Sequence, residues 1–527
     1  MAPVDMESMA SEKDCSKTPE KGKSSAEGHV GEQSRLGGVH GFLARLATKG
    51  SVELRGSMPV PYQEREMTQY VNIFSLWFCL SCNPLPITFG MVGTLSFGMN
   101  LRDAALTILF FILASTAPVA YLSTWGPKTG MRQLVQARFA FGYYHVQILY
   151  SRGTGWLIFT SKYIVSILIL LNLATLTGFC VVDSIIGGQA LSAVMDGTTI
   201  NATVGIVIVS LVALLISFCG FKVLHMYDRF ACIPALLAII IATGCGGKQL
   251  SHQVQAPSAS GALVMSFGGL VASYMLPWAA LASDFSTYIH PKAPSLRIAL
   301  YTYVGLALPT TLLMILGAAI GGATPNVPAW MEGYETNAAS GVLGAMLHPA
   351  GGFGRFVTVI LAFSMVGNLS ATMYSITLNF QMFLPWLFRI PRVIFSVVIT
   401  AIVIGVAIQA AKSFFTNLEN FIGVIGYWSA AFIGVVVVEH MLFRKRNFNS
   451  YTEDEDAWDD AKKLPPGFAA IGAAVLSFAL VIPGMSQIWF LGPIAETTGD
   501  VGLEFALFFS ALFYVPLRFL ERKMTGR

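Results

Sequence analysis

The sequence predicts an all-α membrane protein of about twelve transmembrane helices, arranged as a five-plus-five inverted repeat followed by two C-terminal helices. The first observation is composition: of the 527 residues, 54% are apolar and 12% are charged, and the mean hydropathy is +0.63. Soluble domains carry about 25% charged residues. The second is that apolar runs of about 20 residues, long enough to cross a bilayer, recur along the chain. The third is that prolines interrupt the first and the sixth of these runs.

A polar segment precedes the apolar runs. Residues 1–69 are rich in Ser, Lys, Glu and Gly and contain no apolar core of the kind that a signal peptide needs. We expect them to form a disordered cytoplasmic tail, followed by a transmembrane domain over residues 70–520 and a short cytoplasmic tail over 521–527. The expected spans are residues 70–98, 103–124, 163–195, 203–220, 230–247, 261–283, 297–322, 355–385, 391–411, 416–440, 466–487 and 500–520.

Basic side chains gather in alternate loops, and this pattern indicates the orientation of the chain. Short loops rich in Lys and Arg stay on the cytoplasmic side of a membrane. The loops of the other set hold little beyond Arg102, Lys248, Arg355 and Lys412. We therefore expect a multi-pass protein of the plasma membrane with both termini in the cytoplasm. The basic set comprises Lys128, Arg132, Arg138, Lys222, Arg229, Lys292, Arg297, Arg389, Arg392, Arg444, Lys445 and Arg446.

The charge and the cysteines exclude several kinds of partner. The net charge of +4 is small and lies in loops and tails, so it indicates membrane topology and no nucleic-acid surface. The seven cysteines are odd in number, lie mostly within apolar runs and show no metal-ligand spacing. Such cysteines are typical of small buried hydrophobic residues. We expect the lipid bilayer as a partner, and no metal and no cofactor.

The stretch WFCLSCNPLPITFG places two prolines and a cluster of small polar groups inside the first span. Proline removes a backbone donor and displaces the carbonyl four residues earlier, so a helix containing Pro84 and Pro86 must kink or break. Irregular backbone at that depth survives only where protein buries it or a watery cavity receives it. A packed kink remains open. The sequence favours a discontinuous helix whose ends, near Ser81 and Asn83, face a substrate.

A second interruption stands in the sixth span, within SYMLPWAALASDF. Pro277 and Trp278 lie there, five spans after the first break. Two broken helices at corresponding positions of two five-span halves indicate an inverted repeat with a binding site between the halves. Trp278 lies too deep for an interface anchor, and an indole beside a helix break offers a flat face on which a planar ligand can stack.

Few ionisable or amide side chains lie inside the spans, and such groups are functional by default. Asp183 lies in the third span among small neighbours, and Asp284 closes the sixth span. The eighth span holds Asn368 and Thr372 within a polar stretch. A threonine can bond back to its own helix, whereas an amide offers two donors and an acceptor that need partners.

No catalytic motif accompanies these residues. The sequence contains no GxSxG elbow, no Walker loop and no HExxH pair, and its eight histidines are scattered. Glu439 and His440 end the tenth span beside Arg444, and we interpret them as a structural group. A channel would need a pore-lining repeat, and a seven-helix receptor has too few spans. The sequence therefore favours a transporter over an enzyme.

Several blocks of the sequence resemble one known family, in that family's order. They are PVPYQER, GMVGTLSFGMNLRDAALTILFF, WGPKTGMRQLVQARFAFGYY, GFCVVDSIIGGQALSAV, CGFKVLHMYDRFACIP, WAALASDFSTYIHP, FRIPR and IGYWSAAFIGVVVVEHMLFRKR. Through these blocks nearly everything after residue 52 resembles the purine–cytosine permease branch of the nucleobase:cation symporter family. The resemblance implies a fold of the leucine-transporter type and uptake of nucleobases such as cytosine or purines, which fungal members couple to protons.

The site residues of that family match this sequence unevenly. Its stacking tryptophan in the sixth span is present as Trp278, and Asn368 is kept in the eighth span. Phe179 stands where the third span usually has tryptophan, and Asp183 stands where it usually has asparagine. Thr372 replaces a further asparagine of the usual pattern. The resemblance therefore implies a kept scaffold with an altered site.

The expected partners are a small nucleobase-like molecule and a coupled cation, the proton. Because a carboxyl at mid-membrane depth is costly to ionise, Asp183 and Asp284 are the candidates for carrying that proton. The altered site leaves two alternatives open: a transporter of a vitamin-like or hydantoin ring, and a sensor that binds its substrate without transporting it. The expected substrate-binding residues are Ser81, Asn83, Phe179, Asp183, Trp278, Asn368 and Thr372.

One stretch departs from the family pattern. Family members pass from FGYY to LLNLAT in a few residues, whereas residues 145–169 intervene here and include Arg152 and Lys162. The segment near residues 148–168 is either a genuine insertion or an artefact of the gene model, and both interpretations stay open.

Overall fold

The computed structural model of the chain describes residues 58–142, 164–194, 200–218, 221–383, 392–454, 456–460 and 462–526. Its first half holds α3 (Val71–Ser81), α4 (Pro84–Leu95), α5 (Leu101–Ser123), α8 (Ile164–Ala193), α9 (Ala202–Phe218) and α10 (Phe221–Gly246). Its second half holds α11 (Gly261–Met275), the 3-10 helix η4 (Leu276–Ala280), α12 (Ser295–Ala323), α14 (Gly351–Phe383), α15 (Arg392–Ala410) and α16 (Phe414–Val438).

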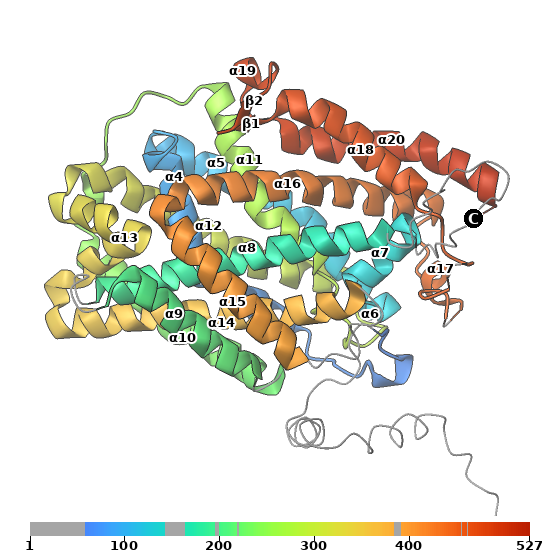
Figure 1. Cartoon of the computed structure of the whole chain (residues 1–527), viewed down its shortest axis with the longest axis horizontal. Coiled ribbons are helices and arrows are strands. Elements are labelled where there is room, and N and C mark those ends of the chain that lie inside the picture. Colours follow the sequence, from blue (N-terminus) through green and yellow to red (C-terminus); the bar gives the residue numbers. More distant parts are fainter. Residues whose placement is uncertain are drawn as a thin grey trace, which may run out of the picture. The chain divides into compact units, whose positions relative to one another are not determined.

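Two further long helices and several short elements complete the described chain. The long helices are α18 (Phe468–Gly484) and α20 (Gly502–Thr525). α13 (Pro328–Leu347) is a 20-residue helix between α12 and α14. The short elements include α6 (Trp125–Thr129), α7 (Gln133–Phe141), α17 (Asn449–Thr452), α19 (Ala495–Thr498) and the antiparallel pair β1 (Ser486–Gln487) and β2 (Phe490–Leu491). In Figure 1, α13 and α17 lie toward opposite ends of the helix bundle, which we call the α13 end and the α17 end.

The helices confirm a membrane protein. Seven described segments are long and apolar enough to cross a bilayer, and the bent pair α3 and α4 adds an eighth. Two of the seven hold two helices each: Pro328–Phe380 covers α13 and most of α14, and Val393–Phe443 covers α15 and α16. Three shorter apolar helices are Ala202–Ser217, Ala231–Gly246 and Phe468–Gly484. Within the described residues these segments are consistent with the expected number of about twelve spans.

The first span breaks where two prolines follow an asparagine, as the sequence predicts. α3 ends at Ser81, α4 begins at Pro84, and the two helices are bent by 55°. The Asn83 side chain accepts a hydrogen bond from the backbone N–H of Leu85 at 2.9 Å and donates one to the backbone carbonyl of Leu80 at 2.9 Å. The amide thus satisfies one backbone group on each side of a break that lipid could not solvate.

The sixth span changes helix type at its proline. α11 ends at Met275, and the chain continues as the 3-10 helix η4, whose first turn contains Pro277. Residues 281–288 follow as turns, and regular α-helix resumes only at Ser295. The second predicted break is therefore confirmed, and Trp278 lies within it.

The packing of the helices follows the predicted repeat. α5 lies along α12 and α8 lies along α14, so the second and third spans of one half meet the corresponding spans of the other half. α4 crosses α12 closely, because a side-chain carbon placed at Gly90 would lie 1.8 Å from the backbone oxygen of Met314. α18 and α20 pack against each other, and α20 packs on α16 (Figure 1).

Some segments differ from expectation. α13 was not predicted, because Glu332 and Glu335 interrupt its apolar residues, and its helix bends at Ala338, whose φ of 48° is rare for a residue with a side chain. The folded chain also begins before residue 70. The backbone N–H of Val60 donates to the carbonyl of Gly130 at 2.8 Å. The remainder of the expected tail, residues 1–57, and most of the segment near 148–168 lie outside the described residues.

A buried ion cluster ties the last span to the end of α16. Arg518 donates from Nε to Oε2 of Glu439 at 3.1 Å and from Nη1 to Oε2 of Glu521 at 2.8 Å. The hydroxyl of Tyr514 donates to the same Glu439 oxygen at 2.9 Å, and Arg444 Nε lies 3.3 Å from the other oxygen of Glu439. Glu439 thus lies in a structural cluster, as the sequence indicated.

Candidate functional site

A small cavity lies between the third, sixth and eighth spans, at the second helix break. Its volume is about 20 Å³, which is room for about one water molecule. α8, the η4 region and α14 each contribute to its wall. The lining residues are Asn172, Thr175, Leu176, Phe179, Pro277, Trp278, Leu281, Asn368 and Thr372.

Two aromatic rings face each other across this cavity. The ring centroids of Phe179 and Trp278 are 6.4 Å apart, and their planes differ by 27°. Trp77 supports the indole from behind, edge to face, with centroids 5.6 Å apart. A planar ring in contact with both faces would need about 7 Å between them, twice a van der Waals contact of about 3.5 Å. If the two rings moved apart slightly, a flat ligand would fit between them.

Asp183 and Asn368 form one hydrogen-bonded unit. The Asn368 side chain donates from Nδ2 to Oδ2 of Asp183 at 2.8 Å. Asp183 is fully buried and lines neither this cavity nor the next, whereas Asn368 lines both. The free oxygens, Oδ1 of each residue, have no hydrogen-bond partner among the described residues. The hydrogen bond to Asp183 fixes the orientation of the Asn368 amide and leaves its carbonyl oxygen unpaired. Asp183 therefore contacts the cavity only indirectly, through Asn368.

Of the two predicted residues of the first span, only Asn83 lines a cavity, a second and smaller one of about 10 Å³. Both ends of the Asn83 amide are already bonded to the backbone at the helix break. Ser81 is buried at the end of α3 and lines neither cavity. Thr372 lines the first cavity, and its hydroxyl donates to the backbone carbonyl of Asn368 at 2.8 Å.

Asp284 is not brought to either cavity. Its Oδ1 accepts a hydrogen bond from the backbone N–H of Gln133 at 2.8 Å, and its Oδ2 lies 3.7 Å from Nη1 of Arg132. These contacts hold the start of α7 against the segment that follows η4. In this structure Asp284 therefore links two segments of the chain and does not reach a cavity.

Sequence analysis missed Asn172, which lines the cavity two turns before Phe179 on α8. A signal for it was present, since an amide within an apolar span needs a partner. A spacing of seven residues also places it on the same helix face as Phe179.

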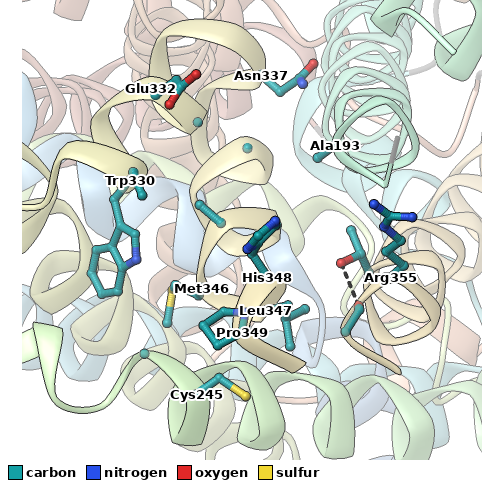
Figure 2. A pocket seen from close by; sticks show the side chains of 18 of the residues that line it. Ala193, Cys245, Trp330, Glu332, Asn337, Met346, Leu347, His348, Pro349 and Arg355 are labelled. Carbon is teal, nitrogen blue, oxygen red and sulfur yellow. Dashed lines mark hydrogen bonds between the residues drawn. The ribbon is translucent and has the colours of Figure 1, made fainter. Parts of the chain in front are cut away.

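A larger hollow lies at the α13 end. Its volume is about 720 Å³, and it shares no lining residue with the cavity at Trp278. Figure 2 shows Trp330 and Arg355 on opposite sides of this hollow, with His348 between them in this view. Glu332 and Asn337 from α13 line it as well. The hollow is wide and polar enough to hold water.

Comparison with known proteins identifies one permease family and several related transporters. Residues 59–502 match the family described as permeases for cytosine/purines, uracil, thiamine and allantoin. The purine-cytosine permease fcyB of Emericella nidulans is 33% identical over 491 residues, which cover 92% of each chain. The vitamin B6 transporter TPN1 of Saccharomyces cerevisiae is 26% identical over 543 residues, which cover 92% of this chain and 90% of the other.

Solved structures show the same fold. Mhp1, a nucleobase-cation-symport-1 family transporter in a closed conformation with bromovinylhydantoin bound, matches with a TM-score of 0.61 and 15% identity. The match covers 89% of this chain and 96% of that one. The inward-facing conformation of Mhp1 gives the same TM-score of 0.61. This likeness confirms the expected transporter fold.

Proposed function

Because the chain belongs to the family of permeases for cytosine/purines, uracil, thiamine and allantoin, we propose that it is a plasma-membrane symporter that couples uptake of a nucleobase, such as cytosine or a purine, to protons. Family membership makes it a membrane transporter. The substrate and the coupled ion are the parts that this proposal adds.

One observation carries the proposal: two aromatic faces flank a cavity that also receives an amide, beside a broken helix. Phe179 and Trp278 would hold a flat ring by stacking. Asn368 would accept a hydrogen bond from the edge of the ring through its free Oδ1. A ring with two apolar faces and a polar edge fits this arrangement.

The route to the site would run from the hollow at the α13 end. This follows if the basic loops are cytoplasmic, which would put the α13 end outside the cell and both termini inside. Alternating access would then open the cavity to one end at a time.

We expect tags at Met1 and Arg527 to resist external protease in intact cells, and cleavage of either tag would overturn this orientation.

Uptake measurements test the substrate. The full chain, expressed in a yeast strain without its own permeases, is expected to take up radiolabelled adenine or cytosine, and to do so less at high external pH or with a protonophore. Uptake of pyridoxine or a hydantoin alone would favour the vitamin-like or hydantoin alternative. Binding without uptake would identify a sensor.

Asp183 is our candidate for the coupled proton. It is fully buried, accepts one hydrogen bond from Asn368, and forms no salt bridge with any residue that the structure describes. The titratable side chains on which a charge at Asp183 acts are Cys180 and Tyr274. An ionised carboxylate in such surroundings is costly, which favours a carboxyl that gains and loses a proton as the site opens.

Asp183→Asn should separate coupling from recognition. Asparagine has the same shape and can still accept from Asn368, but it cannot carry a proton. A coupling role predicts that uptake loses its pH dependence while ring binding stays within a few-fold of the parent. A recognition role predicts a changed substrate preference instead. If Asp183→Asn and Asp183→Ala both transport like the parent at every pH, Asp183 only packs.

A further inference from the structure

Asn172 presents an unpaired amide to the cavity. Its side chain is 1% exposed, and neither Nδ2 nor Oδ1 has a hydrogen-bond partner among the described residues. Each buried polar group left unpaired costs about 1–3 kcal/mol, and native proteins rarely tolerate one without a reason. An orphaned amide that lines a cavity indicates a ligand that pairs with it.

The amide lies where the edge of a stacked ring would point. Asn172 and Phe179 share one face of α8, seven residues or about 10 Å of helix rise apart. Both side chains line the cavity, and Trp278 faces Phe179 across it. A ring held between Phe179 and Trp278 can therefore direct its polar edge along the cavity toward Asn172.

The two threonine hydroxyls of the cavity are already engaged. The Thr175 hydroxyl donates to the carbonyl of Leu171 at 2.9 Å and accepts from Nε1 of Trp428 at 3.0 Å. The Thr372 hydroxyl donates within its own helix. Among the described residues, the amide atoms of the lining that lack a partner are both ends of Asn172 and the Oδ1 of Asn368.

We propose that Asn172 is a specificity-determining residue that selects rings carrying an exocyclic amino group next to an unprotonated ring nitrogen. This inference rests on the proposed function. An amide places a donor and an acceptor side by side, which matches such an edge with two hydrogen bonds. Cytosine and adenine have this edge, whereas uracil and unsubstituted purine do not.

Paired competitors test this selection in the full-length protein. Inhibition of radiolabelled adenine uptake is measured with unlabelled adenine and with purine, and inhibition of cytosine uptake with cytosine and 2-hydroxypyrimidine. A two-point pair is worth about 1–3 kcal/mol, so the parent should prefer the amino ring by about 5- to 150-fold. In Asn172→Leu this preference should fall to about 3-fold or less, by loss of affinity for the amino ring.

The ratio of two inhibition constants does not depend on the amount of folded protein. Asn172→Asp is a second variant, whose side chain keeps the hydrogen-bond acceptor and loses the donor. Asn417→Leu is the matched control: Asn417 is an exposed amide that lines neither cavity and donates to the backbone carbonyl of Ala410 at 2.9 Å, so its ratio should equal that of the parent. An unchanged ratio in Asn172→Leu and Asn172→Asp would overturn the inference while leaving the proposed function intact. A parent that transports neither ring would overturn the proposed function, and this inference with it.

Discussion

Trp278→Ala is expected to abolish high-affinity uptake while the protein still reaches the cell surface. Stacking of a base on an aromatic side chain is worth about 1–3 kcal/mol by alanine substitution, which corresponds to about 5- to 150-fold in apparent affinity. The indole also forms the wall opposite Phe179, so its removal would leave a bound ring with one aromatic face. Trp278→Phe should keep part of the affinity, because a smaller flat face remains.

The measurement is concentration-dependent uptake, corrected for surface protein by a fluorescent tag. Trp489→Ala is the control, since Trp489 lies in the turn between β1 and β2 and is 65% exposed. Its apparent affinity should equal that of the parent. Unchanged affinity in Trp278→Ala would remove Trp278 from the site and with it the stacking slot.

Arg518→Leu is expected to destabilise the protein strongly without changing which ring it binds. The substitution leaves the buried carboxylates of Glu439 and Glu521 without the guanidinium between them. Breaking a buried ion pair from one side costs about 3–5 kcal/mol, because a charge remains in a dry site. The thermal midpoint of the detergent-solubilised protein, followed by gel filtration, should fall by several degrees.

Lys463→Leu is the matched control for this cluster. Lys463 pairs with Asp454, but both side chains are nearly half exposed, so water replaces the lost contact. Its thermal midpoint should remain close to that of the parent. A parent-like midpoint in Arg518→Leu would mean that the cluster does not hold α20 on α16.

Both helix breaks were predictable because their cause is local. Pro84 and Pro277 have no backbone N–H, and each stands at the start of the element that follows its break. Proline alone does not fix a break, because Pro118, Pro309 and Pro516 lie inside continuous helices. α13 was not predictable in the same way. Its charged residues interrupt the apolar pattern, and no glycine or proline marks its bend at Asn337 and Ala338. The family resemblance placed Phe179, Trp278, Asn368 and Thr372 at one site, and the structure brings them to one cavity.

The parts of the site that sequence analysis missed depend on distances between helices. Asp183 was expected to contact the substrate, whereas the structure places it behind Asn368. Asn83 was expected at the site, yet its amide is used by the helix break itself. Asn172 was overlooked because its lack of a partner is visible only when the neighbouring helices are in place.

The hydrogen bond between Asn368 and Asp183 has a thermodynamic consequence for the transport cycle. If Asp183 carries the proton and Asn368 contacts the ring, both binding equilibria act on one side-chain pair and share a coupling free energy. Such coupling is reciprocal: the factor by which a proton tightens ring binding equals the factor by which a bound ring tightens proton binding. Ring affinity measured against pH and proton uptake measured on ring binding must then agree. A weak coupling would let rings or protons cross alone, so this one contact would set how strictly the two cargoes travel together.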